Sequence, residues 1–374
     1  MSPPSDRKVT LIPGDGIGPE VTASARAIVE ASGAHFDWDI QPAGLAAQAA
    51  GLPALGAAVF ESIGRTGLAL KGPTGTPFGV PYRIEIGAHA MNPKPEPRVY
   101  PSVAIALRKE FDLYMNLRPI RSFPAVVSRY AGVDLLIFRE NSEDLYMGRE
   151  RMVDADTAEA IKTITRGATE RAARFACETM VRLGRRKLAI GHKSNVLKLT
   201  DGLFLHAAQA VAKNYPQIET RDRVIDALCM ELVLAPERYD CLLLANLYGD
   251  IVSDLGAGLI GGLGLAPGAN IGERCAIFEA VHGTAPDIAG RDIANPMAMI
   301  LSATMLLKHV GELDCAQRIE RALTSVLERR DRLTPDLIAN ADALRDGKTA
   351  AGTSGIGTSG GGTRAMTQAI IEAL

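Results

Sequence analysis

Paired cysteines, long hydrophobic runs and an excess of charge of one sign are all missing from this chain of 374 residues. The five cysteines are scattered, and no two of them have the C-x-x-C spacing. This argues against a zinc site or a disulfide framework and is typical of a reducing compartment. No apolar run approaches the roughly 18 residues of a membrane span, and Met1 to Lys8 lack the apolar core of a secretion signal. The sequence therefore predicts a cytoplasmic protein with no membrane partner.

The charge balance is nearly neutral, with 41 basic and 43 acidic residues and a formal net charge of −2. Because nucleic acids are bound by basic surfaces, this balance argues against a nucleic-acid partner. Hydrophobic residues make up 47% of the chain and charged residues 22%, as in ordinary globular proteins. The length suffices for one large domain or two packed lobes with a substantial core.

Short apolar runs alternate with helical patterns along the chain. The apolar runs lie at 9–12, 68–70, 135–138, 187–190 and 241–245. Pro19 suits the first turn of a helix that continues over 21–31, and residues 157–183 have a helical pattern. This alternation predicts an α/β fold with helices on the faces of a sheet and a site at the strand ends.

Two stretches look irregular. Residues 78–101 contain several prolines and little periodicity, which predicts a long surface loop. Residues 347–363 are rich in glycine, serine and threonine, which predicts a mobile segment.

Two acidic residues provide the first chemical indication. Asp250 and Asp254 directly follow an apolar strand, and their spacing of four places both carboxylates on one face of a helix. Such a pair can hold Mg²⁺ or Mn²⁺ and leave coordination positions for substrate oxygens. The alternative is an ordinary solvated first turn whose acids are favoured by the helix dipole.

Basic residues near other strand ends extend this pattern. Arg108, Arg118 and Arg139 each lie close to a predicted strand end, and Lys193 follows the strand at 187–190. Guanidinium groups that converge on one cleft suit a substrate with several carboxylates, because they bind carboxylate in a bidentate manner. Taken singly, each of these residues could equally be an ordinary surface residue.

Six longer segments are more specific. They read LIPGDGIGPEV, LKGPTGTP, FRENSEDLY, HKSNVLKLTDGLF, NLYGDIVSDLGAGLIGGLGLAPGANIG and FEAVHGTAPDIAGRDIANP. In this order, from about residue 9 to the C-terminus, they resemble the isocitrate/isopropylmalate dehydrogenase family of β-decarboxylating dehydrogenases. The segment KLTDGLF is more similar to the NAD-dependent isocitrate and homoisocitrate branches than to isopropylmalate dehydrogenase.

The resemblance implies two α/β domains with a central sheet shared across the cleft between them. The large, NAD-binding domain is expected at 1–113 and 261–374, and the small domain at 114–260. Within the small domain, residues 148–189 are expected to form a clasp that interlocks with a second copy of the chain. The resemblance further implies a homodimer in which each active site is completed by the partner.

The resemblance also assigns roles to residues of the matched motifs. Asp226, Asp250 and Asp254 would hold Mg²⁺ or Mn²⁺, with Asp226 and Lys193 reaching across the dimer. Lys193 would assist removal of the hydroxyl proton, and Tyr146 would protonate C3 after CO₂ leaves. The substrate carboxylates would be held by Ser102, Arg108, Arg118 and Arg139.

A nicotinamide site is implied in the same way. Gly14, Gly16 and Gly18 do not have the G-x-G-x-x-G spacing, so the site is not of the Rossmann type. Asp287 and Ile288 match the positions that discriminate between the two cofactors. A carboxylate there accepts hydrogen bonds from the ribose hydroxyls of NAD and repels a 2′-phosphate, so NAD is expected. The expected contacts are Thr76, Glu279, His282, Gly283, Thr284, Ala285, Asp287, Ile288 and Asn295.

The segment that reads the substrate departs from the family pattern. About a dozen extra residues precede Ser102, and Ala104 stands where isocitrate enzymes have an asparagine. Losing a polar contact at such a site changes substrate discrimination strongly. Isocitrate is therefore the first expectation, and homoisocitrate, isopropylmalate, tartrate and a phosphonate analogue stay open. A regulatory subunit without activity is a further alternative, although Tyr146, Lys193 and the three aspartates are all present.

Overall fold

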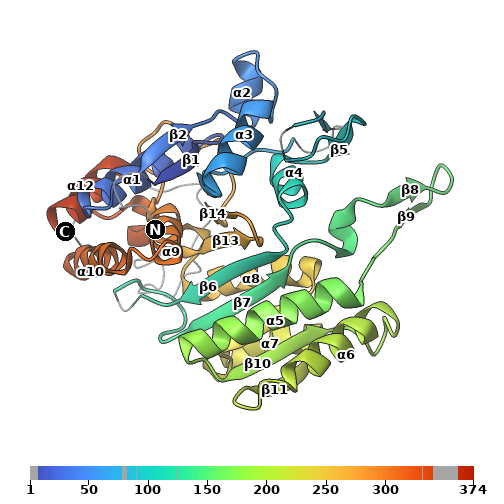
Figure 1. Ribbon diagram of the computed structural model, residues 1–374. Helices are drawn as coiled ribbons and strands as arrows, with labels where there is room; N and C mark the ends of the chain where they lie inside the picture. Colours follow the sequence, from blue (N-terminus) through green and yellow to red (C-terminus); the bar gives the residue numbers. More distant parts are fainter. Residues whose placement is uncertain (1–6, 78–81, 90, 124, 331, 340–360) are drawn as a thin grey trace.

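The computed structural model describes residues 7–77, 82–89, 91–123, 125–330, 332–339 and 361–374. Its centre is one twisted ten-stranded sheet (Figure 1). From one edge to the other the strands are β11 (Glu219–Val224), β10 (Lys187–His192), β12 (Cys241–Leu244), β7 (Asp134–Glu140), β6 (Met115–Arg121), β13 (Pro267–Ile271), β14 (Ala276–Ala280), β3 (Leu68–Lys71), β1 (Lys8–Ile12) and β2 (Asp37–Ile40). The predicted α/β fold is confirmed.

The sheet has two parallel flanks joined by an antiparallel centre. Strands β11, β10, β12 and β7 are parallel, as are β14, β3, β1 and β2. Between them, β7–β6, β6–β13 and β13–β14 pair in antiparallel fashion. The two parallel flanks therefore run in opposite directions, with the antiparallel strands β6 and β13 between them.

Helices cover both halves of the sheet. They are α1 (Gly18–Ala31), α2 (Leu45–Ala49), α3 (Ala57–Thr66), α4 (Val103–Glu110), α5 (Arg166–Leu183), α6 (Thr200–Ala212), α7 (Ile225–Leu234), α8 (Asn246–Ile260), α9 (Met297–His309), α10 (Leu313–Arg329) and α12 (Thr363–Glu372). Helices α5, α6, α7 and α8 pack on the β11-to-β6 half, and α1, α9, α10 and α12 pack together on the other (Figure 1). No helix within the described ranges is long and apolar enough to cross a membrane.

The structure corrects one predicted helix. Residues 157–183 have a helical pattern, but Ala158–Ala160 form strand β9, and α5 begins only at Arg166. Thr165 caps α5 because its hydroxyl oxygen accepts a hydrogen bond from the Ala168 backbone N–H at 3.3 Å. β9 pairs with β8 (Glu150–Met152) in a hairpin that extends away from the body of the molecule (Figure 1).

The predicted loop at 78–101 also contains regular structure. Strands β4 (Ile84–Ile86) and β5 (Arg98–Tyr100) form an antiparallel hairpin. Ile84 and Ile86 are each only 4% exposed, so this segment is packed rather than lying free on the surface. Of the stretch 347–363 that was predicted to be mobile, residues 347–360 lie outside the described residues.

Candidate active site

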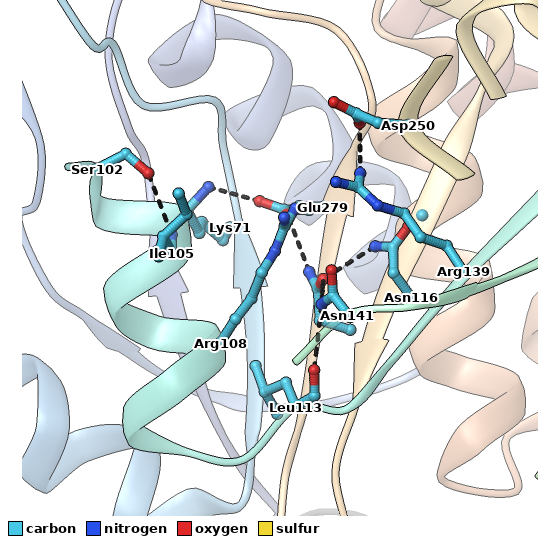
Figure 2. Close-up of polar contacts among 12 residues, drawn as sticks. Lys71, Ser102, Ile105, Arg108, Leu113, Asn116, Arg139, Asn141, Asp250 and Glu279 are labelled. Carbon is cyan, nitrogen blue, oxygen red and sulfur yellow. Dashed lines mark hydrogen bonds and ion pairs between the residues drawn. The ribbon is translucent and has the colours of Figure 1, made fainter. Parts of the chain in front are cut away.

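A cavity of about 270 Å³ lies where the two halves of the sheet meet. Nine residues with an expected binding or catalytic role line it: Ser102, Arg108, Arg118, Arg139, Tyr146, Asp250, Glu279, His282 and Gly283. They come from α4 with its N-cap, β6, β7, the 3₁₀ helix η2 (Asp144–Met147), α8, β14 and the turn after β14, so only the folded chain brings them together. Figure 2 shows Arg108, Arg139, Asp250 and Glu279 of this cavity.

Helix α4 forms one wall. Ser102 is its N-cap, and the hydroxyl oxygen accepts a hydrogen bond from the Ile105 N–H at 3.2 Å (Figure 2). Arg108, in the last turn, lies with Nη2 3.6 Å from Glu279 Oε1. Its Nε is buried and donates no hydrogen bond within the described residues. This wall therefore offers a hydroxyl and an unsatisfied guanidinium donor to a ligand.

Two buried arginines from neighbouring strands form the floor. Arg139 of β7 donates from Nε to Asn246 Oδ1 at 2.9 Å and from Nη1 to Asp250. Arg118 of β6 donates from Nε to Asn116 Oδ1 at 2.7 Å. Burial and the neighbouring guanidinium groups lower the pKa of Arg139, although arginine stays protonated near neutral pH. Its Nη2 has no acceptor among the described residues. The floor is therefore electropositive and suited to an anion.

Asp250 and Asp254 lie on α8, and the predicted shared face is confirmed by their contacts. Arg118 Nη2 lies 3.4 Å from Asp250 Oδ1, and Arg118 Nη1 lies 3.6 Å from Asp254 Oδ1. Burial raises the pKa of both carboxyls, but Arg139 and Arg118 bring that of Asp250 below its ordinary value. The pKa of Asp254 stays raised by burial. Two carboxylates one helical turn apart are hard oxygen donors that fit Mg²⁺ or Mn²⁺.

Tyr146 lies in the short 3₁₀ helix η2 (Asp144–Met147) and faces these groups. Its hydroxyl donates a hydrogen bond to Asp250 Oδ2. The Arg139 guanidinium carbon lies 4.9 Å from the centre of the Tyr146 ring. Burial and the bond to Asp250 raise the pKa of Tyr146, so its hydroxyl is protonated at neutral pH.

Three further residues of the site were not named from the sequence. Lys71 donates to Glu279 Oε2 at 2.6 Å, and Lys71 and Arg108 hold the pKa of the buried Glu279 down to about 2 (Figure 2). Asn270 accepts a hydrogen bond from Asn116 at 2.9 Å and donates one to Glu279 at 2.7 Å. Lys71 belongs to the matched segment LKGPTGTP and Asn270 to the one that ends in APGANIG, so the resemblance could have indicated both as site residues. Asn116 lies within a strand, and no matched segment contains it.

Lys193 and Asp226 do not line this cavity in a single chain. Their side chains form an ion pair with each other, with Lys193 Nζ 2.7 Å from Asp226 Oδ1. Within the described residues, no group of three or more histidine, cysteine or acidic side chains is placed to hold a metal ion. One subunit therefore brings Asp250 and Asp254 together but leaves Asp226 apart from them.

The expected cofactor loops meet beside the cavity. The Ile17 N–H donates to the Thr284 carbonyl at 2.9 Å, and the Asp15 N–H donates to the Pro73 carbonyl at 2.7 Å. Gly16 has φ +60°, and a Cβ there would lie 2.0 Å from the Thr284 carbonyl oxygen, so only glycine allows this contact. The loop that follows β1 is thereby joined to the segments around residues 73 and 284.

The individual cofactor positions differ in their surroundings. His282 Nε2 is buried without a partner in the described structure, and burial lowers the pKa of this ring. Thr76 and Asp287 are exposed, whereas Asn295 is buried and donates to Asp336 at 2.9 Å. Six of the nine expected cofactor contacts do not line the cavity: Thr76, Thr284, Ala285, Asp287, Ile288 and Asn295.

Comparisons with known proteins agree with this architecture. Residues 8–358 match the family model described as isocitrate/isopropylmalate dehydrogenase. The isocitrate/homoisocitrate dehydrogenase of Thermus thermophilus is 41% identical over 367 residues, which cover 98% of each chain. The 3-isopropylmalate dehydrogenase of Archaeoglobus fulgidus is 43% identical over 338 residues, covering 90% of this chain and 96% of that protein. The crystal structure of isocitrate dehydrogenase from Methylococcus capsulatus has a TM-score of 0.85 and 44% identity, covering 98% and 99%.

Fold and cavity thus define an α/β protein with an arginine-rich cavity. The chain belongs to the isocitrate/isopropylmalate dehydrogenase family. The predicted family and the enzyme class, a nicotinamide-dependent β-decarboxylating dehydrogenase, are both confirmed. Relatives of similar identity are named for different hydroxy acids.

Proposed function

We propose that this enzyme oxidises a 2-hydroxy acid with a 3-carboxylate and then decarboxylates it, using NAD and Mg²⁺ or Mn²⁺. The best candidate reaction converts isocitrate to 2-oxoglutarate. The observation that carries the proposal is the convergence of Arg108, Arg118 and Arg139 with Tyr146 and Asp250 on one cavity.

The charges of the cavity suit a polycarboxylate. Four cationic side chains line it, those of Lys71 and the three arginines, against the carboxylates of Asp250 and Glu279. Buried cations require anionic partners, and the unpartnered Arg108 Nε and Arg139 Nη2 can each donate to a carboxylate oxygen. A substrate with several carboxylates satisfies both requirements.

Asp250 and Asp254 would hold the metal ion, together with Asp226 from the partner subunit. A bound divalent cation supplies positive charge that stabilises the negative charge developing on the substrate during oxidation and decarboxylation. Arg118 and Arg139, which neutralise Asp250 in the free subunit, lie within reach of both a carboxylate ligand and this aspartate pair.

Proton transfers fall to two residues. Lys193 from the partner would assist removal of the C2 hydroxyl proton as hydride leaves C2 for the nicotinamide. Loss of CO₂ leaves an enolate, and Tyr146 would then donate its proton to C3. A protonated, half-buried tyrosine that faces the cavity is suited to this role as a general acid.

A homodimer would complete the site. Strands β8 and β9 are exposed along their whole length, and Met152 and Val153 in this hairpin are 62% and 50% exposed. Apolar side chains on a projecting hairpin suit burial against a second copy. We assign residues 148–189 to a clasp of this kind, which would bring Lys193 and Asp226 to the partner's cavity.

The domain division proposed is 1–113 with 261–374 as the large domain and 114–260 as the small one. Strand β6 of the small domain pairs with β13 of the large domain through three residue pairs. Within the small domain, β6 pairs with β7 through seven. A short ladder favours hinge movement that closes the cavity on its substrate.

NAD is the preferred cofactor because Asp287 is exposed beside the loop that carries His282 and Gly283. Its carboxylate can accept hydrogen bonds from the ribose hydroxyls of NAD and would repel the 2′-phosphate of NADP. Ile288 occupies the neighbouring discriminating position.

The C3 substituent of the substrate is read by α4, where Ala104 and Ile105 line the cavity. Because Ala104 provides no polar contact at this position, the second candidate is a 3-substituted malate other than isocitrate: homoisocitrate, isopropylmalate, tartrate or a phosphonate analogue.

The test is NADH formation with isocitrate and MgCl₂, run in parallel with NADP and with each alternative hydroxy acid. Rapid NADH formation that EDTA abolishes and that is slow with NADP supports the proposal. Failure of every hydroxy acid to give NADH or NADPH would reject it.

A further inference from the structure

Glu110, the last residue of α4, is a buried acidic residue with no role in the proposed reaction. Its carboxylate has a side-chain exposure of 0% and accepts four hydrogen bonds. The donors are His89 Nε2 at 3.1 Å, Asn92 Nδ2 at 2.9 Å, Arg98 Nε at 2.5 Å and Tyr100 OH at 2.6 Å. All four donors belong to the extra segment that precedes Ser102.

These contacts keep the buried group charged. Burial raises the pKa of Glu110, but the hydrogen bonds from Arg98, Tyr100 and Asn92 outweigh it and bring the pKa below its ordinary value. A buried carboxylate that is fully hydrogen-bonded holds its partners in defined positions, because each lost bond leaves a buried polar group unsatisfied.

The extra segment is anchored independently of Glu110. Ile84 and Ile86 of β4 pack in a cluster with Phe60 and Val103, and the His89 ring stacks on Phe60 with 4.0 Å between ring centres. β5 lies directly beside α4 (Figure 1). The hairpin is therefore held by apolar packing as well as by its bonds to Glu110.

The opposite side of α4 faces the substrate cavity. Arg108 and Glu110 are two residues apart, so their side chains point about 200° apart around the helix axis. Arg108, Ile105 and Ser102 line the cavity, whereas Glu110 does not. The helix has only eight residues, and so short a helix depends on tertiary contacts for its position.

We propose that Glu110 is a positioning residue for the hydroxy-acid substrate, and that the hairpin of β4 and β5 is a specificity element that acts through it. By fixing the outer side of α4, Glu110 sets where Ser102, Ile105 and Arg108 meet the substrate. This inference rests on the proposed function, since it requires that the cavity binds the hydroxy acid.

The test compares Glu110→Gln with the wild type in steady-state kinetics, using the hydroxy acid that the wild type oxidises fastest. Glutamine keeps the shape of the side chain but removes its charge and one acceptor. We expect the KM for the hydroxy acid to rise about tenfold, with kcat changed less than about threefold and the KM for NAD unchanged. Tyr100→Phe, which removes a single hydrogen-bond donor, is expected to raise the KM for the hydroxy acid about threefold and to leave the KM for NAD unchanged.

Asp240→Asn is the matched control. Asp240 also accepts several bonds, from Arg185 Nη1 at 2.6 Å and from the Arg186 and Lys187 N–H groups at 2.9 and 3.1 Å, but it does not line the cavity. This variant is expected to lose thermal stability while keeping the KM for both the hydroxy acid and NAD.

A Glu110→Gln enzyme that loses stability but keeps the wild-type KM for the hydroxy acid would overturn the inference. So would an equal rise in the KM of hydroxy acid and NAD, because that would report general damage to the fold. If Glu110→Gln does not fold, Tyr100→Phe decides by the same criteria. A wild type that oxidises no hydroxy acid is a separate result, which would reject the proposed function and this inference with it.

Discussion

Lys193 Nζ lies 2.7 Å from Asp226 Oδ1, and this pair is separate from the cavity that holds Tyr146 and Asp250 within the same chain. The sequence resemblance assigns all four residues to one catalytic site. The geometry of a single subunit separates them, so a shared site between two subunits reconciles the two observations.

Complementation between inactive subunits tests this arrangement. Tyr146→Phe and Lys193→Ala homodimers are each expected to be nearly inactive. If the sites are shared, a mixed dimer has one site with both changes and one intact site. Refolding the two variants together at equal amounts should then restore about a quarter of wild-type activity. Activity that stays at the level of the separate variants would show that each chain builds its own site.

Removing a guanidinium from the cavity should weaken substrate binding. Arg108→Gln is expected to lower kcat/KM for the hydroxy acid by about 100-fold, because a charge-assisted bond to a carboxylate is lost in a buried site. Arg26→Gln is the control, since Arg26 forms an exposed ion pair with Glu30 on α1. An equal kcat/KM in the two variants would show that Arg108 does not bind the substrate.

Cofactor preference should follow the charge at residue 287. Asp287→Lys combined with Ile288→Tyr is expected to shift the ratio of kcat/KM for NAD and NADP toward NADP by about 100-fold. The reason is that a cation replaces the carboxylate that would repel the 2′-phosphate. Asp314→Lys makes the same charge change at an exposed position on α10 and should leave the ratio unchanged.

The metal site should depend on Asp254. Asp254→Asn is expected to weaken Mn²⁺ binding about tenfold or more in a calorimetric titration, because one anionic oxygen ligand is lost. Asp314→Asn serves as the control. Unaltered Mn²⁺ affinity in the Asp254 variant would mean that the ion, if bound, lies elsewhere.

Stability at low pH should depend on Glu110, whose folded pKa lies below the ordinary value of 4.5. At pH values between these two, the unfolded chain takes up a proton that the folded chain does not. The contribution of Glu110 to stability is therefore complete above about pH 4.5 and is lost as the pH falls through the folded pKa. The decrease in melting temperature from pH 7.5 to pH 4 should be smaller in Glu110→Gln than in the wild type. Glu30→Gln, a change at an exposed residue, should keep the wild-type pH response.

The hairpin of β4 and β5 shows where sequence patterns are insufficient. Residues 78–101 contain prolines and few alternating apolar residues, and this pattern predicts a surface loop. Ile84 and Ile86 are buried because they pack against Phe60 and Val103 from other elements. Such contacts join residues far apart in the sequence, and no local periodicity reports them.

The sequence by itself determined the α/β fold, the family and the identity of nine of the residues that line the cavity. Apolar periodicity specifies strands and helices locally, and long motifs are specific because many residue identities must match at once. Only the tertiary structure decided that Arg108, Arg139 and Asp250 share one cavity with Lys71, while Lys193 and Asp226 lie apart from it. Those relationships depend on strand order and on packing between distant segments, which are set by the burial of the whole core rather than by any local pattern.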